Sequence, residues 1–214
     1  MPLPPLAHNV SDPSKLSPLD WSNYFENKQQ LAIGDTTFNV YSSGLTNTGA
    51  IFVFHHGAGH SGLTFGLAAK YIFDHCPELC TVVAPDCRNH GDTTGENQEN
   101  LNLDQMVDDL VNVFERMFPD NTRDIVLVGH SMGGAVVAHV AKSKRLPHIL
   151  GLALVDIVEG SAMDSLPSIP MFISQRPQSF KTVESAIAWH IDSEAIHNPE
   201  SARLSVPSLI RRFD

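Results

Sequence analysis

The sequence predicts an α/β domain with a mostly parallel sheet and helices on both faces. Short apolar runs rich in β-branched residues alternate along the chain with segments in which apolar residues recur every three or four positions. The length of 214 residues, with 42% hydrophobic and 18% charged residues, is also typical of a globular chain with one core.

Five segments predict strands. Residues 37–41 alternate and then meet a Ser-Ser-Gly turn, which indicates an edge strand. The other four are apolar nearly throughout, as strands buried on both faces are: residues 51–55, 81–84, 125–128 and 150–155. No strong strand follows the last of these, so we expect one side of the sheet to present an apolar edge.

Helices are predicted between these strands and after the last of them. The clearest has an apolar stripe made by Leu103, Met106, Val107, Leu110, Phe114 and Met117. Further helices are predicted over residues 63–75, 135–142 and 183–191, and one is predicted to open at Asn198 with Pro199 in its first position.

The chain organisation predicts three parts. Residues 1–18 hold five prolines without periodicity, which indicates a mobile N-terminal tail. Residues 19–156 hold the alternating core. Residues 157–214 are loop-rich, with Pro167, Pro170 and Pro177, and then helical, so they predict the beginning of a cap or lid.

Composition excludes several classes of partner. A net charge of −10 argues against nucleic acid or an anionic membrane, because both attract basic patches. The three cysteines, all within residues 76–87, match no zinc pattern and indicate free thiols in a reducing compartment. No signal peptide and no apolar run of about 18 residues is visible. We therefore expect a cytosolic or nuclear protein without a cofactor.

One predicted strand runs into a motif that carries chemistry. Residues 125–128 lead into the pattern G-x-S-x-G, followed by a helix rich in small residues: Gly129-His130-Ser131-Met132-Gly133. A strand, a sharp turn and a helix around this pattern are the context of a nucleophile elbow. The sequence therefore predicts the α/β-hydrolase fold, with Ser131 as the nucleophile.

An oxyanion hole needs two aimed N–H donors. One is predicted to be the backbone of Met132, directly after the nucleophile. The other is expected in the glycine-rich loop after residues 51–55, where glycines allow the backbone to approach a substrate. We assign it to Ala58, with Gly57 as the alternative.

The acid is predicted at Asp156, at the end of the strand that follows the nucleophile's helix, with Glu159 and Asp164 as alternatives. In this fold the histidine comes after the acid in the chain. Only His190 and His197 follow Asp156, and neither has an apolar strand ahead of it. We therefore expect the catalytic histidine to be absent from this chain.

Four other histidines have no spacing typical of metal ligands, so no metal site is predicted: His55, His56, His60 and His90. The segment of residues 85–91, which contains Asp86, Arg88 and His90, indicates a structural loop whose side chains bond backbone groups.

Several stretches resemble the protein phosphatase methylesterases, serine esterases that act on the catalytic subunit of type-2A protein phosphatase. Residues 17–26 resemble the family's lead-in to its first strand, while residues 155–164 and 176–189 resemble more specific stretches. The resemblance covers residues 17–206. It implies Ser131 as nucleophile, Asp156 as acid, and an α/β-hydrolase fold that lacks here the family's final strands and histidine loop.

The resemblance also implies a reaction, hydrolysis of the methyl ester on the phosphatase's C-terminal leucine. Gly57 and Arg176 are then expected near the substrate, with Arg176 and Lys181 attracting an acidic phosphatase tail. Two alternatives stay open: an inactive form that at most binds the phosphatase, and an esterase or lipase of another substrate on the same fold. The absent histidine favours the first alternative for this chain.

Overall fold

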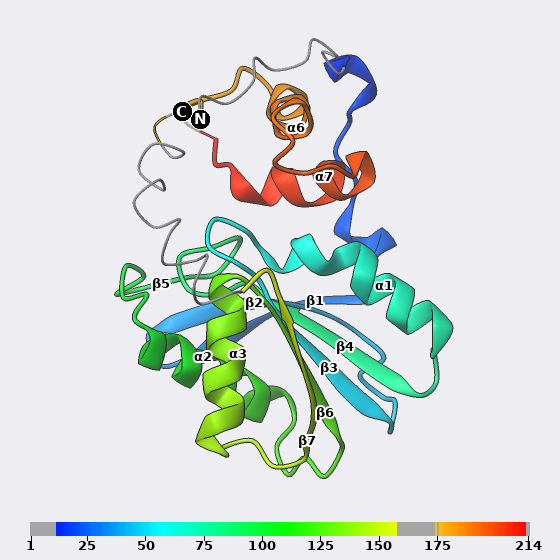
Figure 1. Cartoon of the computed structure of the whole chain (residues 1–214), viewed down its shortest axis with the longest axis vertical. Helices are drawn as coiled ribbons and strands as arrows, with labels where there is room; N and C mark the ends of the chain where they lie inside the picture. The colour runs from blue at the N-terminus through cyan, green and yellow to red at the C-terminus, as the bar shows by residue number, and fades with distance from the viewer. Residues whose placement is uncertain (1–11, 158–173, 175, 213–214) are drawn as a thin grey trace. The chain divides into compact units, whose positions relative to one another are not determined.

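The computed structural model describes residues 12–157, 174 and 176–212. Tertiary contacts divide the chain into two compact units (Figure 1): residues 21–157 form the core unit, and residues 1–20 together with 158–214 form the helical unit. The predicted domain boundaries at residues 18 and 156 stay predictions.

The core unit alternates strands and helices along the chain. Its elements are η2 (Trp21–Asn23), β1 (Asn27–Ile33), β2 (Thr36–Ser43), β3 (Ala50–His55), η3 (Gly62–Phe65), α1 (Gly66–His75), β4 (Cys80–Pro85), β5 (Thr94–Gly95), α2 (Leu103–Met117), β6 (Ile125–His130), α3 (Met132–Ser143) and β7 (Ile149–Val155). The five strands and three helices predicted for this part of the chain are all present, with bounds extended by a few residues at most.

The seven strands form one mixed sheet in the order β1-β2-β4-β3-β6-β7, with β5 paired to β2. The neighbours β4, β3, β6 and β7 run parallel, and β1 and β2 pair antiparallel. The carboxyl ends of β3, β4, β6 and β7 therefore meet at one edge, where parallel sheets place their reactive loops.

Two predictions about strand position were wrong. The strand over residues 37–41 is not an edge strand, because β1 pairs along its outer side. The last strand, β7, is not buried on both faces: Leu150 is 69% exposed, and Leu152, Leu154 and Val155 are exposed as well. Among the described strands β7 pairs only with β6, so it forms the apolar edge that the sequence predicts for one side of the sheet.

The main core lies between the sheet and two helices on the same face. Side chains of α2 and α3, such as Val111, Phe114 and Val137, pack against alternate side chains of the strands, such as Ile51 and Val53. Side chains on the other face pack against the segment around η3, where the ring of Phe54 lies 4.9 Å from the ring of Phe65. Helices thus cover both faces, as predicted.

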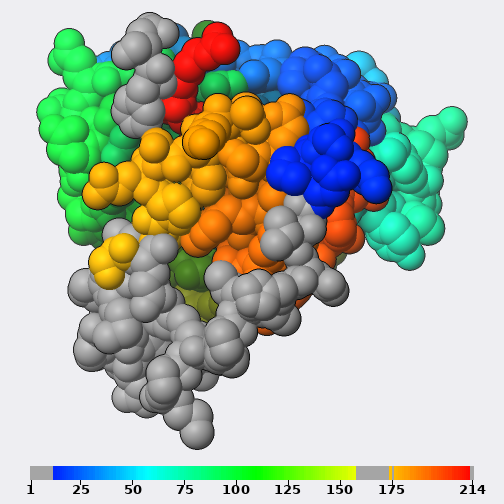
Figure 2. All heavy atoms as spheres, turned by 90° about the horizontal axis from the view of Figure 1, so that it is seen from above, coloured from blue at the N-terminus to red at the C-terminus, as the bar shows by residue number. Residues whose placement is uncertain are grey.

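The helical unit contains η1 (Pro13–Lys15), α6 (Val183–Asp192), α7 (Pro199–Ser205) and η5 (Val206–Leu209). A capping box between Thr182 and Ser185 begins α6, and the side chain of Asn198 caps α7 as predicted. Leu16 packs against the small apolar cluster of these helices, and Figure 2 shows the N-terminal segment in dark blue beside the orange helices. No helix in the described ranges is long and apolar enough to span a bilayer.

Candidate active site

The backbone of Ser131 turns sharply between β6 and α3. Its φ is 50° and its ψ is −119°, a conformation that L-residues rarely adopt and that usually needs support from the surrounding structure. Its N–H donates to the carbonyl of Val155 at 2.9 Å, and its carbonyl accepts from the N–H of Gly134 at 2.8 Å. The serine therefore stands between the end of one strand and the N-terminus of a helix.

Small residues on both sides of the serine allow this turn. A Cβ on Gly129 would lie 2.4 Å from the carbonyl oxygen of Gly133. A Cβ on Gly133 would lie 2.1 Å from the carbonyl oxygen of His55, at the end of β3. The start of α3 thus packs directly on the backbone where the next loop begins.

That next loop, residues 56–61, contains the predicted oxyanion donor. Residues 57–60 form a tight turn in which the N–H of His60 donates to the carbonyl of Gly57 at 3.2 Å, and Gly59 has a φ of +72°. This φ at the third position is what a type II turn requires, so a glycine suits it. A Cβ on Gly57 would lie 2.8 Å from the ring of His130, so this loop touches the elbow.

The two predicted oxyanion donors have unoccupied amides. Met132 is the first residue of α3, where a helix leaves its N–H groups without a helical partner. Within the described residues, neither the N–H of Met132 nor that of Ala58 donates a hydrogen bond. The residue Ala58 itself is exposed.

Asp156 directly follows β7, next to the elbow. The pairing of His130 with Val155 brings the ends of β6 and β7 together, and Asp156 has a φ of 51°. Its side chain is 85% exposed, and one carboxylate oxygen lies 3.9 Å from Nε2 of His130. The alternatives Glu159 and Asp164 lie outside the described residues.

The remaining predicted residues belong to the helical unit. Arg176 is exposed there. The ring of His190 is buried against Trp189, and its Nδ1 lies 2.8 Å from the carbonyl of Ala186. Burial lowers the pKa of His190, and the nearby charge of Arg176 lowers it further. His190 is therefore a packed, neutral side chain of helix α6.

The rings of His55 and His56 are buried and contact backbone groups. Burial lowers the pKa of His55 to about 4 and that of His56 well below its ordinary value, so both rings are neutral. Within the described residues, no group of three or more His, Cys, Asp or Glu side chains is arranged to hold a metal ion.

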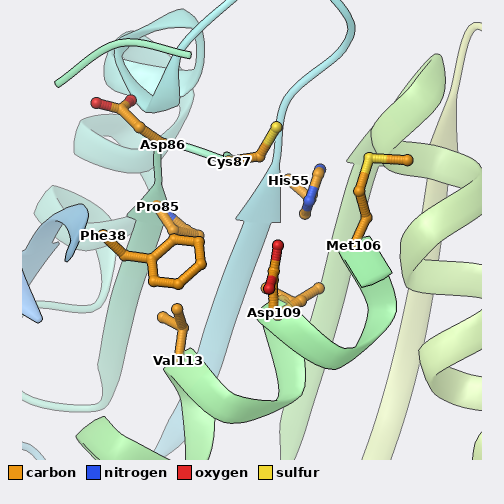
Figure 3. A pocket seen from close by; sticks show the side chains of 9 residues that line it. Phe38, His55, Pro85, Asp86, Cys87, Met106, Asp109 and Val113 are labelled. Atoms are coloured by element: carbon orange, nitrogen blue, oxygen red, sulfur yellow. The ribbon is translucent and has the colours of Figure 1, made fainter. Parts of the chain in front are cut away.

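A small cavity lies beneath this region, between the sheet and α2. Its volume of about 10 Å³ is close to the room that one water needs. His55, Cys87, Met106 and Asp109 are among its lining side chains, as Figure 3 shows. Neither Ser131 nor Asp156 lines this cavity, so it is not part of the candidate active site.

Three contacts of this region were not foreseen from the sequence: Ser131 N–H with Val155, His130 with Asp156, and the hydrogen bonds of His56. These contacts lie at the edge where the carboxyl ends of β3, β4, β6 and β7 meet. The only signal available was that polar residues directly follow several predicted parallel strands.

Comparison with known proteins identifies the family to which this chain is similar. Residues 52–211 match the family model described as alpha/beta hydrolase family. Protein phosphatase methylesterase 1 from Homo sapiens is 41% identical over 92% of this chain and 51% of its own length. The probable protein phosphatase methylesterase 1 from Caenorhabditis elegans is 39% identical over 97% of this chain and 57% of its own length. The chain thus spans about half the length of these curated relatives.

Solved structures share the fold. The thioesterase domain from the curacin biosynthetic pathway superposes with a TM-score of 0.66 at 23% identity, over 88% of this chain and 69% of its own length. Potato epoxide hydrolase I gives a TM-score of 0.52 at 20% identity, over 60% of this chain and 39% of its own. From the family match, the sheet topology and the elbow together, the chain belongs to the alpha/beta hydrolase family.

Proposed function

We propose that the core unit carries a serine carboxylesterase site. In this proposal Ser131 is the nucleophile, Asp156 is the acid, and the N–H groups of Ala58 and Met132 are the oxyanion donors. The observation that carries the proposal is the strained backbone of Ser131 at the start of α3, since such strain persists where it serves a function.

The proposed reaction follows from these positions. The hydroxyl oxygen of Ser131 bonds to the ester carbonyl carbon, and the two amides stabilise the charge that develops on the carbonyl oxygen. The bond to the alcohol then breaks, the alcohol leaves with a proton, and water hydrolyses the acyl-serine to the free acid. A base must accept the serine proton and return it to the alcohol.

We propose that none of the histidines in the described residues supplies that base. His190 is buried in the helical unit with its Nδ1 at a backbone carbonyl. His130 is next to Ser131, but its Nδ1 is buried and lies beneath Gly57, and its Nε2 is 3.9 Å from Asp156. Esterase activity of these 214 residues alone is therefore expected to be slow, because loss of the base from a triad leaves only residual catalysis.

For the substrate we propose the methyl ester on the C-terminal leucine of the type-2A phosphatase catalytic subunit. The names of the relatives support an esterase that acts on a phosphatase, and their identity of about 40% extends over nearly the whole chain. Arg176 and Lys181 are proposed to attract the acidic phosphatase tail. The alternative is a form that binds the phosphatase without turnover, which the proposed lack of a base favours.

The test is labelling of the 214-residue chain by a fluorophosphonate probe, which reacts with activated serines. Slow labelling is expected, lost in Ser131→Ala and unchanged in the control Ser143→Ala, whose hydroxyl donates to the carbonyl of Val140 at the far end of the same helix. Fast labelling would refute the proposal that the catalytic base is absent. No labelling after prolonged incubation would refute the nucleophile.

The substrate proposal has its own readout. A methyl-esterified peptide with the phosphatase's C-terminal sequence should slow the labelling of Ser131. The same peptide with a free carboxylate serves as the matched control. Equal effects of the two peptides would count against recognition of the methyl ester.

A further inference from the structure

Two loops meet beside the candidate oxyanion hole. The oxyanion loop, residues 56–61, follows β3, and the anchor loop, residues 86–91, follows β4. Since β3 and β4 are parallel neighbours, both loops leave the sheet at the same edge. Neither the family match nor the proposed reaction assigns a role to the contact between them.

Each loop contributes one histidine that accepts an amide hydrogen from the other loop. The N–H of Gly59 donates to Nε2 of His90 at 2.9 Å, and the N–H of Cys87 donates to Nε2 of His56 at 3.0 Å. The two rings also lie close together, with centroids 5.1 Å apart. We call this reciprocal pair, His56 and His90, the histidine staple.

These contacts determine which ring nitrogen carries the proton. A nitrogen that accepts from a backbone N–H has a free lone pair, so Nε2 is unprotonated in both rings. The hydrogen must then be on Nδ1, and each Nδ1 does lie 2.8 Å from a carbonyl of its own loop: that of Gly57 for His56 and that of Arg88 for His90. Each ring is thus neutral and makes a hydrogen bond with each of its two nitrogens.

The staple holds the turn that presents Ala58. The carbonyl of Gly57 accepts from His56 and from the N–H of His60, while the N–H of Gly59 is held by His90. Ala58 stands between these two fixed peptide groups and makes no hydrogen bond of its own within the described residues. Without His90, Gly59 would rely on the single turn hydrogen bond for its position.

The anchor loop is rigid enough to serve as the support. The carboxylate of Asp86 accepts from the N–H groups of Gly62 at 2.7 Å and Asp92 at 3.0 Å. Arg88 makes a bidentate pair with Asp109 of α2, at 2.7 and 2.8 Å, and both side chains are buried. The oxyanion loop, with an exposed tip, is therefore attached to a loop that is tied into the core.

We propose that the histidine staple positions the Ala58 amide as an oxyanion donor, with both rings in the neutral Nδ1–H tautomer. His56 and His90 are positioning residues in this proposal, because they act through the backbone of residues 57–59 and not on substrate. The positioning role rests on the proposed esterase function, whereas the tautomers and the protection of Gly59 do not.

The first test is spectroscopic and needs no activity. Long-range ¹H–¹⁵N correlation spectra of the ¹⁵N-labelled chain at neutral pH, assigned with His90→Gln and His56→Gln, report the protonated nitrogen of each ring. Both rings should show Nδ1–H and a bare Nε2. Protonation of Nε2 in either ring would overturn the staple.

The second test uses His90, which is partly exposed, so its variants are expected to fold. Hydrogen exchange of the Gly59 amide should be faster in His90→Ala and near wild type in His90→Gln, whose side-chain oxygen can still accept. His139→Gln is the control, since its ring is exposed on α3 and, within the described residues, its Nδ1 lies 2.9 Å from the carbonyl of Ala135 in its own helix. Unchanged exchange in His90→Ala would overturn the staple even if no serine labelling is seen.

The positioning role is read from the rate of fluorophosphonate labelling. His90→Ala should lower it by roughly 10- to 100-fold, since displacing one oxyanion donor has effects of that order. His90→Gln should stay within about threefold of wild type, by the same reasoning. If His90→Ala labels at the wild-type rate although its Gly59 amide exchanges faster, the contact is purely structural and the positioning role is refuted. If the wild type does not label, the proposed nucleophile fails, and the first two measurements alone decide the staple.

Discussion

The contact between the start of α3 and the end of β3 predicts different effects on stability for substitutions at two adjacent glycines. An alanine at Gly133 would place its Cβ 2.1 Å from the carbonyl oxygen of His55 and 2.6 Å from that of His56, both backbone atoms. An alanine at Gly134 would meet the side chain of Ile157 at 3.2 Å and the carbonyl of Gly129 at 3.4 Å, contacts that small shifts relieve. Gly134→Ala is therefore the matched control for Gly133→Ala.

The magnitude follows from the two opposing effects. Alanine in place of glycine in a helix gains up to about 1 kcal/mol at either position. At Gly133, relief of the contact requires helix and strand end to separate by about 1 Å, and overpacking of this kind costs typically about 1–3 kcal/mol or more. We expect Gly133→Ala to lose about 2 kcal/mol, and Gly134→Ala to change by less than about 0.5 kcal/mol in either direction.

Urea unfolding followed by circular dichroism measures this difference. With a slope of about 2 kcal/mol per molar urea, the midpoint of Gly133→Ala should lie about 1 M below that of the wild type. The midpoint of Gly134→Ala should stay near the wild type. Equal midpoints for the two variants would refute the close packing of α3 on the end of β3.

Other predictions concern buried charge. Arg88→Ala should lower the free energy of unfolding by about 3–5 kcal/mol, because it leaves the carboxylate of Asp109 buried without its ion-pair partner. Arg145→Ala should lower it by less than about 1 kcal/mol, because the ion pair of Arg145 with Asp108 is exposed. Urea unfolding of both variants checks this, and similar losses would contradict it. Stability should also fall as the pH drops from about 6.5 to about 4. Burial holds the pKa of His55 at about 4 in the folded chain, so as the pH falls His55 is protonated in the unfolded chain first. The free energy of unfolding therefore decreases over this pH range, by about 3 kcal/mol in full. His55→Gln should flatten the stability profile over this range, and an unchanged profile would refute the assignment.

The sequence predicted most of the fold because most of its strands and helices carry strong patterns. Helix α2 has the bounds that its apolar stripe predicts, and the four parallel strands are apolar runs. Strand β1 was missed because its residues are mostly polar and it lies at the sheet edge, where hydrogen bonding and not side-chain burial determines the strand. The misplacement of β2 as an edge strand follows from missing β1.

For the candidate site, the sequence predicted the elbow because its glycines and flanking elements are local signals. The geometry of Ser131 and the free amide of Met132 follow from that same turn. The contacts between loops could not be predicted, because they depend on which strands become neighbours. The pairing of His56 with Cys87, for example, requires β3 and β4 to be adjacent, although 24 residues separate them in the chain.

The backbone of Ser131 also affects the stability of the fold. A residue held at φ 50° and ψ −119° costs the fold of order 1–3 kcal/mol, and a glycine would adopt the same turn with less strain. Replacing the serine with glycine would therefore relieve this strain and remove the hydroxyl. In our proposal the nucleophile is therefore held in place at the expense of folding stability.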